Sequence, residues 1–239
     1  MLTNTKSNKI FYGLSKNAHY NAFILESSLS GLSLEICNTR INTMLVGDFN
    51  AYNILAVFSV ASELGQSKQQ VLNLLSTINH VSGRFNIFQS ENGITGIIDY
   101  AHTPDALLKV IKSISHFCTI ERELIIVVGC GGNRDKGKRS LMGKIAFENS
   151  QKVIFTSDNP RLEKPEIIIE DMCVDLPDDL DGKIYKIINR EEAINFAVNS
   201  ASNGSVILVA GKGHEKFQEI NGQKISFCDS QILKKLLKI

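Results

Sequence analysis

The chain has 239 residues, of which 43% are hydrophobic and 21% charged, so its composition is that of a globular protein and not of a disordered one. Its 26 basic and 25 acidic side chains give a net charge of +1, which offers no electrostatic basis for binding nucleic acid or an anionic membrane surface. The longest apolar runs, such as 54–60, are far shorter than the roughly 20 residues that a membrane helix needs. Residues 1–30 show no secretory signal pattern.

The cysteines suggest a reducing compartment. Their number is odd, no two are spaced as Cys-x-x-Cys, and they stand at positions 37, 118, 130, 173 and 228. Neither a disulfide framework nor a zinc ribbon fits this spacing. We therefore expect reduced, mostly packed thiols and a cytoplasmic protein.

Residues 1–80 predict a few strands and two helices, with no complete sheet of their own. Short extended segments are expected at 9–12, 20–25 and 32–37. Apolar side chains then recur at helical spacing over 50–64, and Gly65 is a helix stop signal. A second helix is expected over 68–78, where Ser67 and Gln70 have the pattern of a capping box.

From about residue 81 onward, strand-like and helix-like segments alternate. This alternation predicts an α/β fold with a mostly parallel sheet, and about 160 residues are enough to bury an independent core. The acidic segment 175–181 is expected to be a solvated connection. The predicted strands are 85–90, 94–98, 124–128, 152–156, 184–188 and 205–210, and the predicted helices are 103–116, 138–148, 165–174 and 190–200.

A glycine-rich turn follows one predicted strand. Residues 132–138 match G-x-x-x-x-G-K, but Arg139 stands where a phosphate loop has the Ser or Thr that binds magnesium. Backbone N–H groups and a helix N-terminus can still face an anion there, beside Arg134, Lys136, Lys138 and Arg139. The alternative is a solvated basic turn, and the spacing does not separate the two.

A second turn begins with Asp99, at the end of another predicted strand. Thr103 and Pro104 provide a helix N-cap and a first helical residue. Strand ends line the ligand crevice of an open α/β sheet, so Asp99 could bind a ribose and His102 an anion. The alternative, in which Asp99 is a second cap and His102 a packed histidine, is favoured by spacing alone.

Two more turns carry both signs of charge. Asp158 and Arg161 suit a zwitterion, or they pair with each other for only about 0–1 kcal/mol. In the turn after the strand 205–210, Lys212 or His214 could bind an anion and Glu215 an ammonium group. All four turns fall at one edge of a parallel sheet, which favours a site for a small amino acid together with a nucleotide.

At these residues the chain resembles the Mur ligases, which build the peptide of the bacterial cell wall. The resemblance covers roughly residues 30–239, and the matching segments agree in order and spacing. They are GDFNAYNILAV (47–57), SGRFNIF (82–88), DYAHTPDAL (99–107), GCGGNRDKGKRSLMG (129–143), TSDNPRLEKPEII (156–168) and AGKGHEKFQ (210–218).

The resemblance implies an incomplete ligase. The family has a UDP-sugar domain, a central ATPase domain and a Rossmann-like C-terminal domain. Residues 1–80 resemble the last, incomplete part of the central domain, and 81–239 the whole C-terminal domain. The family's phosphate loop, modified lysine and Mg²⁺ carboxylate precede this region, so we expect the Mg²⁺ ligands outside the chain and no activity from the chain alone.

The resemblance also implies the reaction, namely ATP-dependent addition of meso-diaminopimelate to UDP-N-acetylmuramoyl-L-alanyl-D-glutamate through an acyl phosphate in peptidoglycan synthesis. Carried over by motif, the expected ATP-binding residues are Asn50 and Asn53 by the adenine, Arg84 by the phosphates and Asp99 by the ribose. The expected residues for meso-diaminopimelate are Arg134, Asp158, Asn159, Pro160, Arg161, Gly211 and Glu215.

The Asp-Asn-Pro-Arg motif implies diaminopimelate and not lysine. Arginine gives a bidentate fork for the distal carboxylate, and acidic side chains can take the ammonium group. Lysine lacks that carboxylate and would leave Arg161 unpaired, at a cost of roughly 1–3 kcal/mol.

Two alternatives differ in class. One is a truncated, non-catalytic module that binds an amino acid or nucleotide. The ligase hypothesis, in contrast, expects the missing N-terminal half in trans or in a longer chain. The other, an ordinary nucleotide-binding Rossmann enzyme, is disfavoured because no G-x-G-x-x-G with a downstream acid is present.

Overall fold

The computed structural model describes residues 5–78, 82–115, 122–177 and 182–239. The chain divides into two compact units, Met1–His80 (unit 1) and Val81–Ile239 (unit 2). Each unit has its own sheet, helices and hydrophobic core. Over the described residues, no helix is both long and apolar enough to cross a membrane.

Unit 1 is a four-stranded sheet covered by two helices. Its first two strands are parallel and the other neighbours are antiparallel. The core lies where α1 packs on the sheet: the ring of Phe58 meets that of Tyr20 edge to face, and the Tyr20 hydroxyl donates to Glu63 over 2.7 Å. The elements are β1 (Tyr12–Gly13), β2 (Tyr20–Ser28), β3 (Gly31–Ile36), β4 (Thr39–Thr43), α1 (Phe49–Glu63) and α2 (Lys68–Ser76).

This sheet corrects the expectation that residues 1–80 lack a complete sheet. The strand missing from the prediction is β4, which is short and has little apolar patterning. It pairs with β3 through a two-residue turn at Cys37 and Asn38, whose φ angles of 45° and 66° are both positive. Positive φ at both positions is the geometry of a type I′ hairpin turn, for which Cys-Asn is a weak sequence signal.

The predicted capping box at the start of α2 is wrong. Ser67 does precede the helix, but its side chain makes no capping hydrogen bond. The helix is held instead by Val71, Leu72 and Leu75, which are buried in the core of unit 1.

Unit 2 is a six-stranded sheet in the order β5-β6-β10-β7-β8-β9. All neighbours are parallel except β5, which is antiparallel to β6. The predicted α/β class with a mostly parallel sheet is therefore confirmed. The strands are β5 (Asn86–Gln89), β6 (Thr95–Asp99), β7 (Leu124–Val128), β8 (Lys152–Phe155), β9 (Ile184–Lys186) and β10 (Val206–Ala210).

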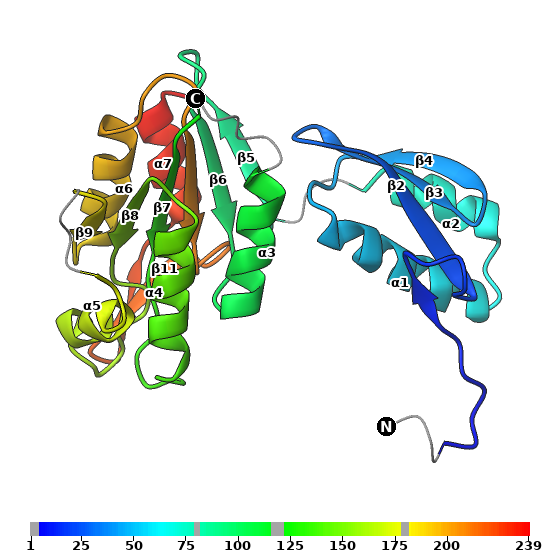
Figure 1. Cartoon of the computed structure of the whole chain (residues 1–239), viewed down its shortest axis with the longest axis horizontal. Helices are drawn as coiled ribbons and strands as arrows, with labels where there is room; N and C mark the ends of the chain where they lie inside the picture. The colour runs from blue at the N-terminus through cyan, green and yellow to red at the C-terminus, as the bar shows by residue number, and fades with distance from the viewer. Residues whose placement is uncertain (1–4, 79–81, 116–121, 178–181) are drawn as a thin grey trace. The chain divides into compact units, whose positions relative to one another are not determined.

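Helices cover both faces of this sheet. Side chains of α6 and α7 pack on one face with alternate strand residues such as Ile125, Val127 and Ile207. The helices α3, α4 and α5 contact one another in succession, and Figure 1 shows α3 and α4 in front of the sheet with α7 behind it. The bounds are α3 (Pro104–Ser115), α4 (Lys138–Glu148), α5 (Pro165–Cys173), α6 (Arg190–Asn199) and α7 (Asp229–Leu237).

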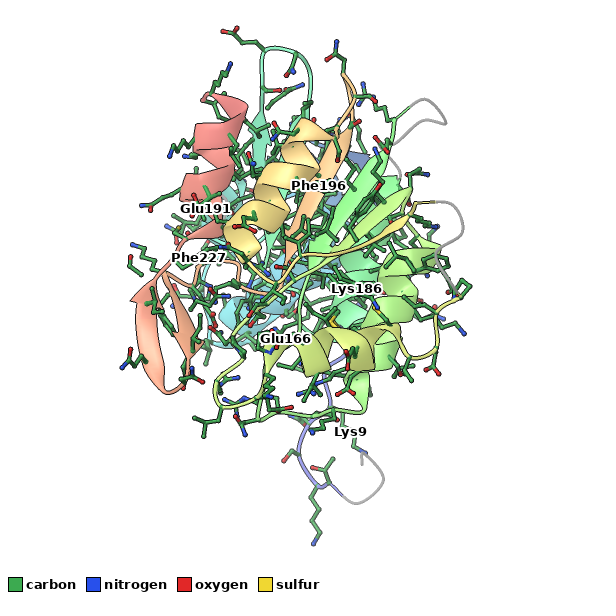
Figure 2. The ribbon with its side chains drawn as sticks, turned by 90° about the vertical axis from the view of Figure 1, so that its left-hand side faces the viewer. Lys9, Glu166, Lys186, Glu191, Phe196 and Phe227 are labelled. Atoms are coloured by element: carbon green, nitrogen blue, oxygen red, sulfur yellow. The ribbon has the colours of Figure 1, made fainter. Side chains whose placement is uncertain are left out.

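A hairpin and α7 were absent from the prediction. The hairpin pairs β11 (Phe217–Ile220) with β12 (Gln223–Ser226) around Asn221 and Gly222, both with positive φ. Asn-Gly is the strongest two-residue hairpin signal, so the sequence did contain it. Figure 2 shows the hairpin standing out from unit 2, with Phe227 at its base.

The described cysteines, 37, 130, 173 and 228, are free thiols, and Cys118 lies outside the described residues. Cys130 lies within the glycine turn after β7 and is buried, and burial raises the pKa of its thiol to about 12. The predicted acidic connection spans 175–181, and its residues 178–181 also lie outside the described residues.

Candidate functional site

The four turns that carry the motifs lie along one edge of the sheet in unit 2. Because β10 pairs in parallel with β6 and with β7, Ala210 lies opposite both Asp99 and Val128. Val128 in turn lies opposite Phe155 of β8. The residues that follow these four strand ends therefore form one continuous rim, as the sequence predicted.

The turns after β7 and β8 interlock. The backbone N–H of Gly132 donates to the carbonyl of Asn159 over 2.9 Å, and the Arg161 Nη1 donates to the carbonyl of Gly132 over 2.8 Å. A Cβ on Gly132 would lie 1.9 Å from the Pro160 carbonyl oxygen, so only glycine permits this approach.

Two of the predicted substrate residues, Arg134 and Arg161, flank the same glycine. A Cβ placed on Gly131 would lie 3.0 Å from Arg161 Nη1 and 3.6 Å from Arg134 Cγ. Arg134 is exposed, whereas Arg161 is partly buried and pairs with Glu219 of β11 over 3.3 Å. The alternative in which Arg161 pairs with Asp158 is therefore wrong.

Lys212 is not available to a ligand anion, in contrast to one expectation from the sequence. Its side chain is fully buried, and its ammonium group donates to Asn159 over 3.0 Å and to Glu215 over 2.9 Å. Asn159 also donates to Glu215 over 2.9 Å. Burial alone would raise the pKa of Glu215, but these hydrogen bonds lower it, so Glu215 is an anion at the rim.

Asp158 is buried beneath the rim, and among the described residues its Oδ2 has no hydrogen-bond partner. Burial raises the pKa of Asp158, and the charges of Arg190 and Lys212 oppose that rise. Gly211 has a φ of 113°, and a Cβ there would lie 2.7 Å from Asp158 Oδ2. Glycine at this position thus leaves room for the carboxylate.

The carboxylate of Asp99, the predicted ribose ligand, accepts hydrogen bonds from two backbone N–H groups. Its Oδ2 accepts from the N–H of Phe85 over 2.9 Å and its Oδ1 from the N–H of Ala101 over 2.7 Å. Neither N–H belongs to α3, so Asp99 is not the second helix cap that spacing favoured; Thr103 accepts the α3 N–H of Ala106 over 3.3 Å. Burial raises the pKa of Asp99, and its role toward a ribose stays a prediction.

Basic and aromatic side chains lie near Asp99; Arg84 and His102 are exposed and Tyr100 is half-buried. The guanidinium of Arg84 lies 4.8 Å from the ring centroid of Tyr100, and the ring of His102 meets that of Tyr100 edge to face. His102 is exposed, so the expectation of a packed histidine is wrong. Lys138 donates to the His102 carbonyl over 2.7 Å.

The remaining predicted ATP residues lie in unit 1, at the start of α1. Asn50 donates to the carbonyl of Val46 over 2.7 Å, and Asn53 donates to Asn50 over 3.0 Å. The four predicted ATP residues are thus divided between the two units, with Arg84 and Asp99 in unit 2.

The Mg²⁺ ion that the family implies does not fit the described residues. No group of three His, Cys, Asp or Glu side chains gathers among them in a way that could hold a metal ion. No chemical step is therefore assigned to a metal within this chain.

Sequence reasoning missed the charges beneath the rim. Arg139 was placed beside an anion, but it is fully buried and pairs with Glu163 over 3.0 Å and with Asp171 over 2.8 Å. Arg190 and Asp229 form a second buried pair over 2.8 Å, between the first residues of α6 and α7. The signal available for both pairs was an arginine at a predicted helix start, which is an unfavourable place for an unpaired cation.

Comparison with known proteins decides the family. Residues 83–213 match the model of the Mur ligase family's glutamate ligase domain. The chain belongs to the Mur ligase family. It is 48% identical over 236 residues to the UDP-N-acetylmuramoyl-L-alanyl-D-glutamate--2,6-diaminopimelate ligase of Parabacteroides distasonis, covering 99% of this chain and 49% of that protein. The same-named ligase of Bacteroides fragilis is 45% identical over 239 residues, again over 49% of its length.

The fold comparison agrees with the family. A solved structure of a UDP-N-acetylmuramoyl-L-alanyl-D-glutamate--2,6-diaminopimelate ligase is 34% identical and superposes with a TM-score of 0.64, covering 96% of this chain and 47% of that one. The chain thus spans about half the length of the Mur ligases that it matches.

The ion pair of Glu163 predicts a specific pH dependence of stability. Hydrogen bonds from Arg139 and from the N–H of Asn133 hold the pKa of Glu163 at about 2, below its ordinary value of 4.5. A carboxyl whose pKa is lowered by folding contributes stability above its unfolded pKa, and that contribution is lost as the pH falls through its folded pKa.

We expect the wild type to exceed Glu163→Gln in free energy of unfolding by a constant amount above about pH 5. The difference should shrink as the pH falls from there toward 2. Urea unfolding at several pH values measures it. Glu170→Gln, which removes an exposed carboxylate from α5, is the control and should follow the wild-type profile. A difference that does not change with pH would contradict the assignment.

Proposed function

We propose that this chain is the C-terminal part of a Mur ligase that uses ATP to add meso-diaminopimelate to UDP-N-acetylmuramoyl-L-alanyl-D-glutamate in peptidoglycan synthesis. The observation that carries the proposal is the meeting of Arg134 and Arg161 around Gly131, on the rim that also holds Glu215. The names of the most similar relatives point to the same reaction.

The rim suits the distal end of diaminopimelate, which bears a carboxylate and an ammonium group on one carbon. Arg161 has donors beyond those given to Glu219 and Gly132, and a guanidinium binds a carboxylate through two parallel hydrogen bonds. Glu215 accepts its described hydrogen bonds through Oε2, so Oε1 is available to an ammonium group. Lysine has no distal carboxylate, so it would leave the remaining Arg161 donors without a ligand acceptor.

In this proposal unit 2 orients the nucleophile. ATP transfers its γ-phosphoryl group to the glutamate γ-carboxylate, and the amine of diaminopimelate attacks the resulting acyl carbon and expels phosphate. Holding the distal zwitterion on the rim fixes the direction of that amine, which lowers the entropic part of the barrier. The glutamate γ-carboxylate and the phosphates that react with it would lie on the remaining half of the ligase.

The ATP site would also be shared. Arg84 and Asp99 of unit 2 would contact the phosphates and the ribose, and Asn50 and Asn53 of unit 1 the adenine. The phosphate loop and the Mg²⁺ ligands would come from the other half, so the chain by itself would be inactive and its setting cytoplasmic. A non-catalytic module that retains the amino-acid site remains the second candidate, because the rim is built entirely within unit 2.

Arg161→Ala should weaken the binding of meso-diaminopimelate by about 1.5–3 kcal/mol, because a charge-assisted hydrogen-bonded pair is lost. Binding of L-lysine should change little. Isothermal titration calorimetry of the purified chain measures both ligands. Arg122→Ala is the matched control, since Arg122 is exposed and precedes β7, at the opposite edge of the sheet. Equal affinities for Arg161→Ala and wild type would remove Arg161 from the site.

Unit 1 offers a surface for the other half of the ligase. α1 buries Ile54, Leu55 and Phe58 on one face, yet Val57, Val60 and Leu64 on its other face are 55%, 60% and 75% exposed. A helix that is apolar on both faces is normally covered on both. In a complete ligase, this second face would pack against preceding residues of the central domain.

Mixing this chain with a separately expressed N-terminal half of a relative should therefore restore ligase activity. Val60→Asp should reduce that activity at least tenfold, because it places a charge in the apolar contact. Val174→Asp is the control, since Val174 is 71% exposed at the end of α5 in unit 2. The measurement is the rate of phosphate release that depends on added diaminopimelate. Full activity with Val60→Asp would contradict this surface, and no activity in any mixture would favour the non-catalytic module.

A further inference from the structure

An ion pair between the buried Arg139 and the partly exposed Glu163 ties together the two turns that carry the predicted substrate arginines. Glu163 follows the Asp-Asn-Pro-Arg turn, and its Oε1 accepts the backbone N–H of Asn133 in the glycine turn after β7. The same carboxylate accepts Arg139 Nη1 and Nη2, each over 3.0 Å. We call Arg139, Glu163 and Asn133 the clasp.

The clasp is anchored in the body of unit 2. Arg139 lies in the first turn of α4 and is fully buried, and its Nη1 also donates to Asp171 of α5 over 2.8 Å. Removing a partner of a buried charge strongly destabilises the folded protein. Contact with Arg139 therefore favours one position of the Glu163 carboxylate. Arg139 of α4 thus bonds both to Asp171 of α5 and to Glu163, which in turn binds Asn133. These bonds couple the positions of the two turns.

Both turns contain backbone that is costly to hold. Asn133 and Arg161 have φ angles of 51° and 53°, the left-handed region that residues other than glycine seldom adopt. Such conformations are strained and persist only when the surroundings enforce them. Here Glu163 binds the N–H of Asn133, and the Asn133 Oδ1 accepts the N–H of Leu162 over 3.1 Å.

Each left-handed residue sits at a predicted substrate contact: Arg134 directly follows Asn133, and Arg161 is itself left-handed. The clasp therefore ties the Arg134 stem, whose Cγ lies beside Gly131, to the turn that carries the Arg161 guanidinium. It also keeps the Glu163 carboxylate occupied by Arg139, so this anion does not compete for the two arginines at the rim.

We propose that Arg139 and Glu163 are positioning residues that determine amino-acid specificity, by holding Arg134 and Arg161 at the spacing that a distal carboxylate requires. This inference rests on the proposed function, because it assumes that the rim binds diaminopimelate. Neither residue touches the ligand. Their loss should thus affect a ligand with a distal carboxylate and leave one without it nearly unchanged.

The test uses the full chain with two variants. Glu163→Gln keeps the size of the side chain but removes its charge and replaces one of its two acceptor oxygens by an NH₂ donor. Asn133→Gly accepts the left-handed backbone without strain, so it should fold even if Glu163→Gln does not, while it removes the bond to Leu162. Glu170→Gln, an exposed carboxylate on α5, is the matched control.

We expect each variant to bind meso-diaminopimelate about tenfold more weakly than wild type, since displacements of about 1 Å at a site have effects of this size or larger. Binding of L-lysine should stay within about twofold, and the backbone amide of Asn133 should exchange with deuterium at least about tenfold faster in Glu163→Gln. A merely structural pair would weaken both ligands equally. Unchanged diaminopimelate affinity in both variants, or equal losses for both ligands, would overturn the inference.

Failure of the proposed function would look different. If the wild type binds neither amino acid, the function assigned to the rim is wrong, and amide exchange then decides whether the clasp orders the turns. Unchanged exchange at Asn133 and Leu162 in Glu163→Gln would overturn the clasp as well. Faster exchange confined to these turns would retain the clasp as the element that orders them.

Discussion

Parallel pairing of β10 with both β6 and β7 is the constraint on which the rim of unit 2 depends. This pairing places Ala210 between Asp99 and Val128, and so brings three turns from distant parts of the sequence side by side. A slip of one residue would move every side chain of β10 to the opposite face of the sheet, where the packing partners differ. The turns can then approach closely, as where the N–H of Gly211 donates to the Asp99 carbonyl over 3.1 Å.

The charged residues of the motifs divide into two groups with different roles. Lys212 and Arg139 are buried and hold the turns in place through hydrogen bonds to Asn159, Glu215, Glu163 and Asp171, while Asp158 is buried beneath them. Arg134 is exposed and Arg161 partly so, and these two present positive charge at the rim. A site for a zwitterion needs this division, because side chains that bind ligand must keep donors free while others fix their position.

The sequence was sufficient for the α/β class, and each segment predicted after residue 81 has a counterpart whose ends differ by at most two residues. Periodicity is a strong signal where strands are fully apolar, as in β7 and β10. It failed for β4 and β12, because their stability comes from pairing across a two-residue turn and not from an apolar pattern.

The grouping of the substrate residues was predictable for a similar reason, since parallel strands end at one edge. Their individual states were not. Nothing local in the sequence shows that Lys212 is buried against Glu215, or that Arg139 reaches Glu163 and Asp171, because these partners are fixed by packing between turns and helices. The assignment of Asn50, Asn53, Arg84 and Asp99 to ATP stays a prediction, since these residues belong to different units.

The measurement that tests the central claim most directly is an NMR titration of the purified chain with meso-diaminopimelate, using L-lysine as the control. The account predicts shifts with diaminopimelate alone, confined to Arg134, 158–161 and 211–215 on the rim of unit 2. A well-dispersed spectrum that shows no shifts with diaminopimelate, or the same shifts with lysine, would contradict it.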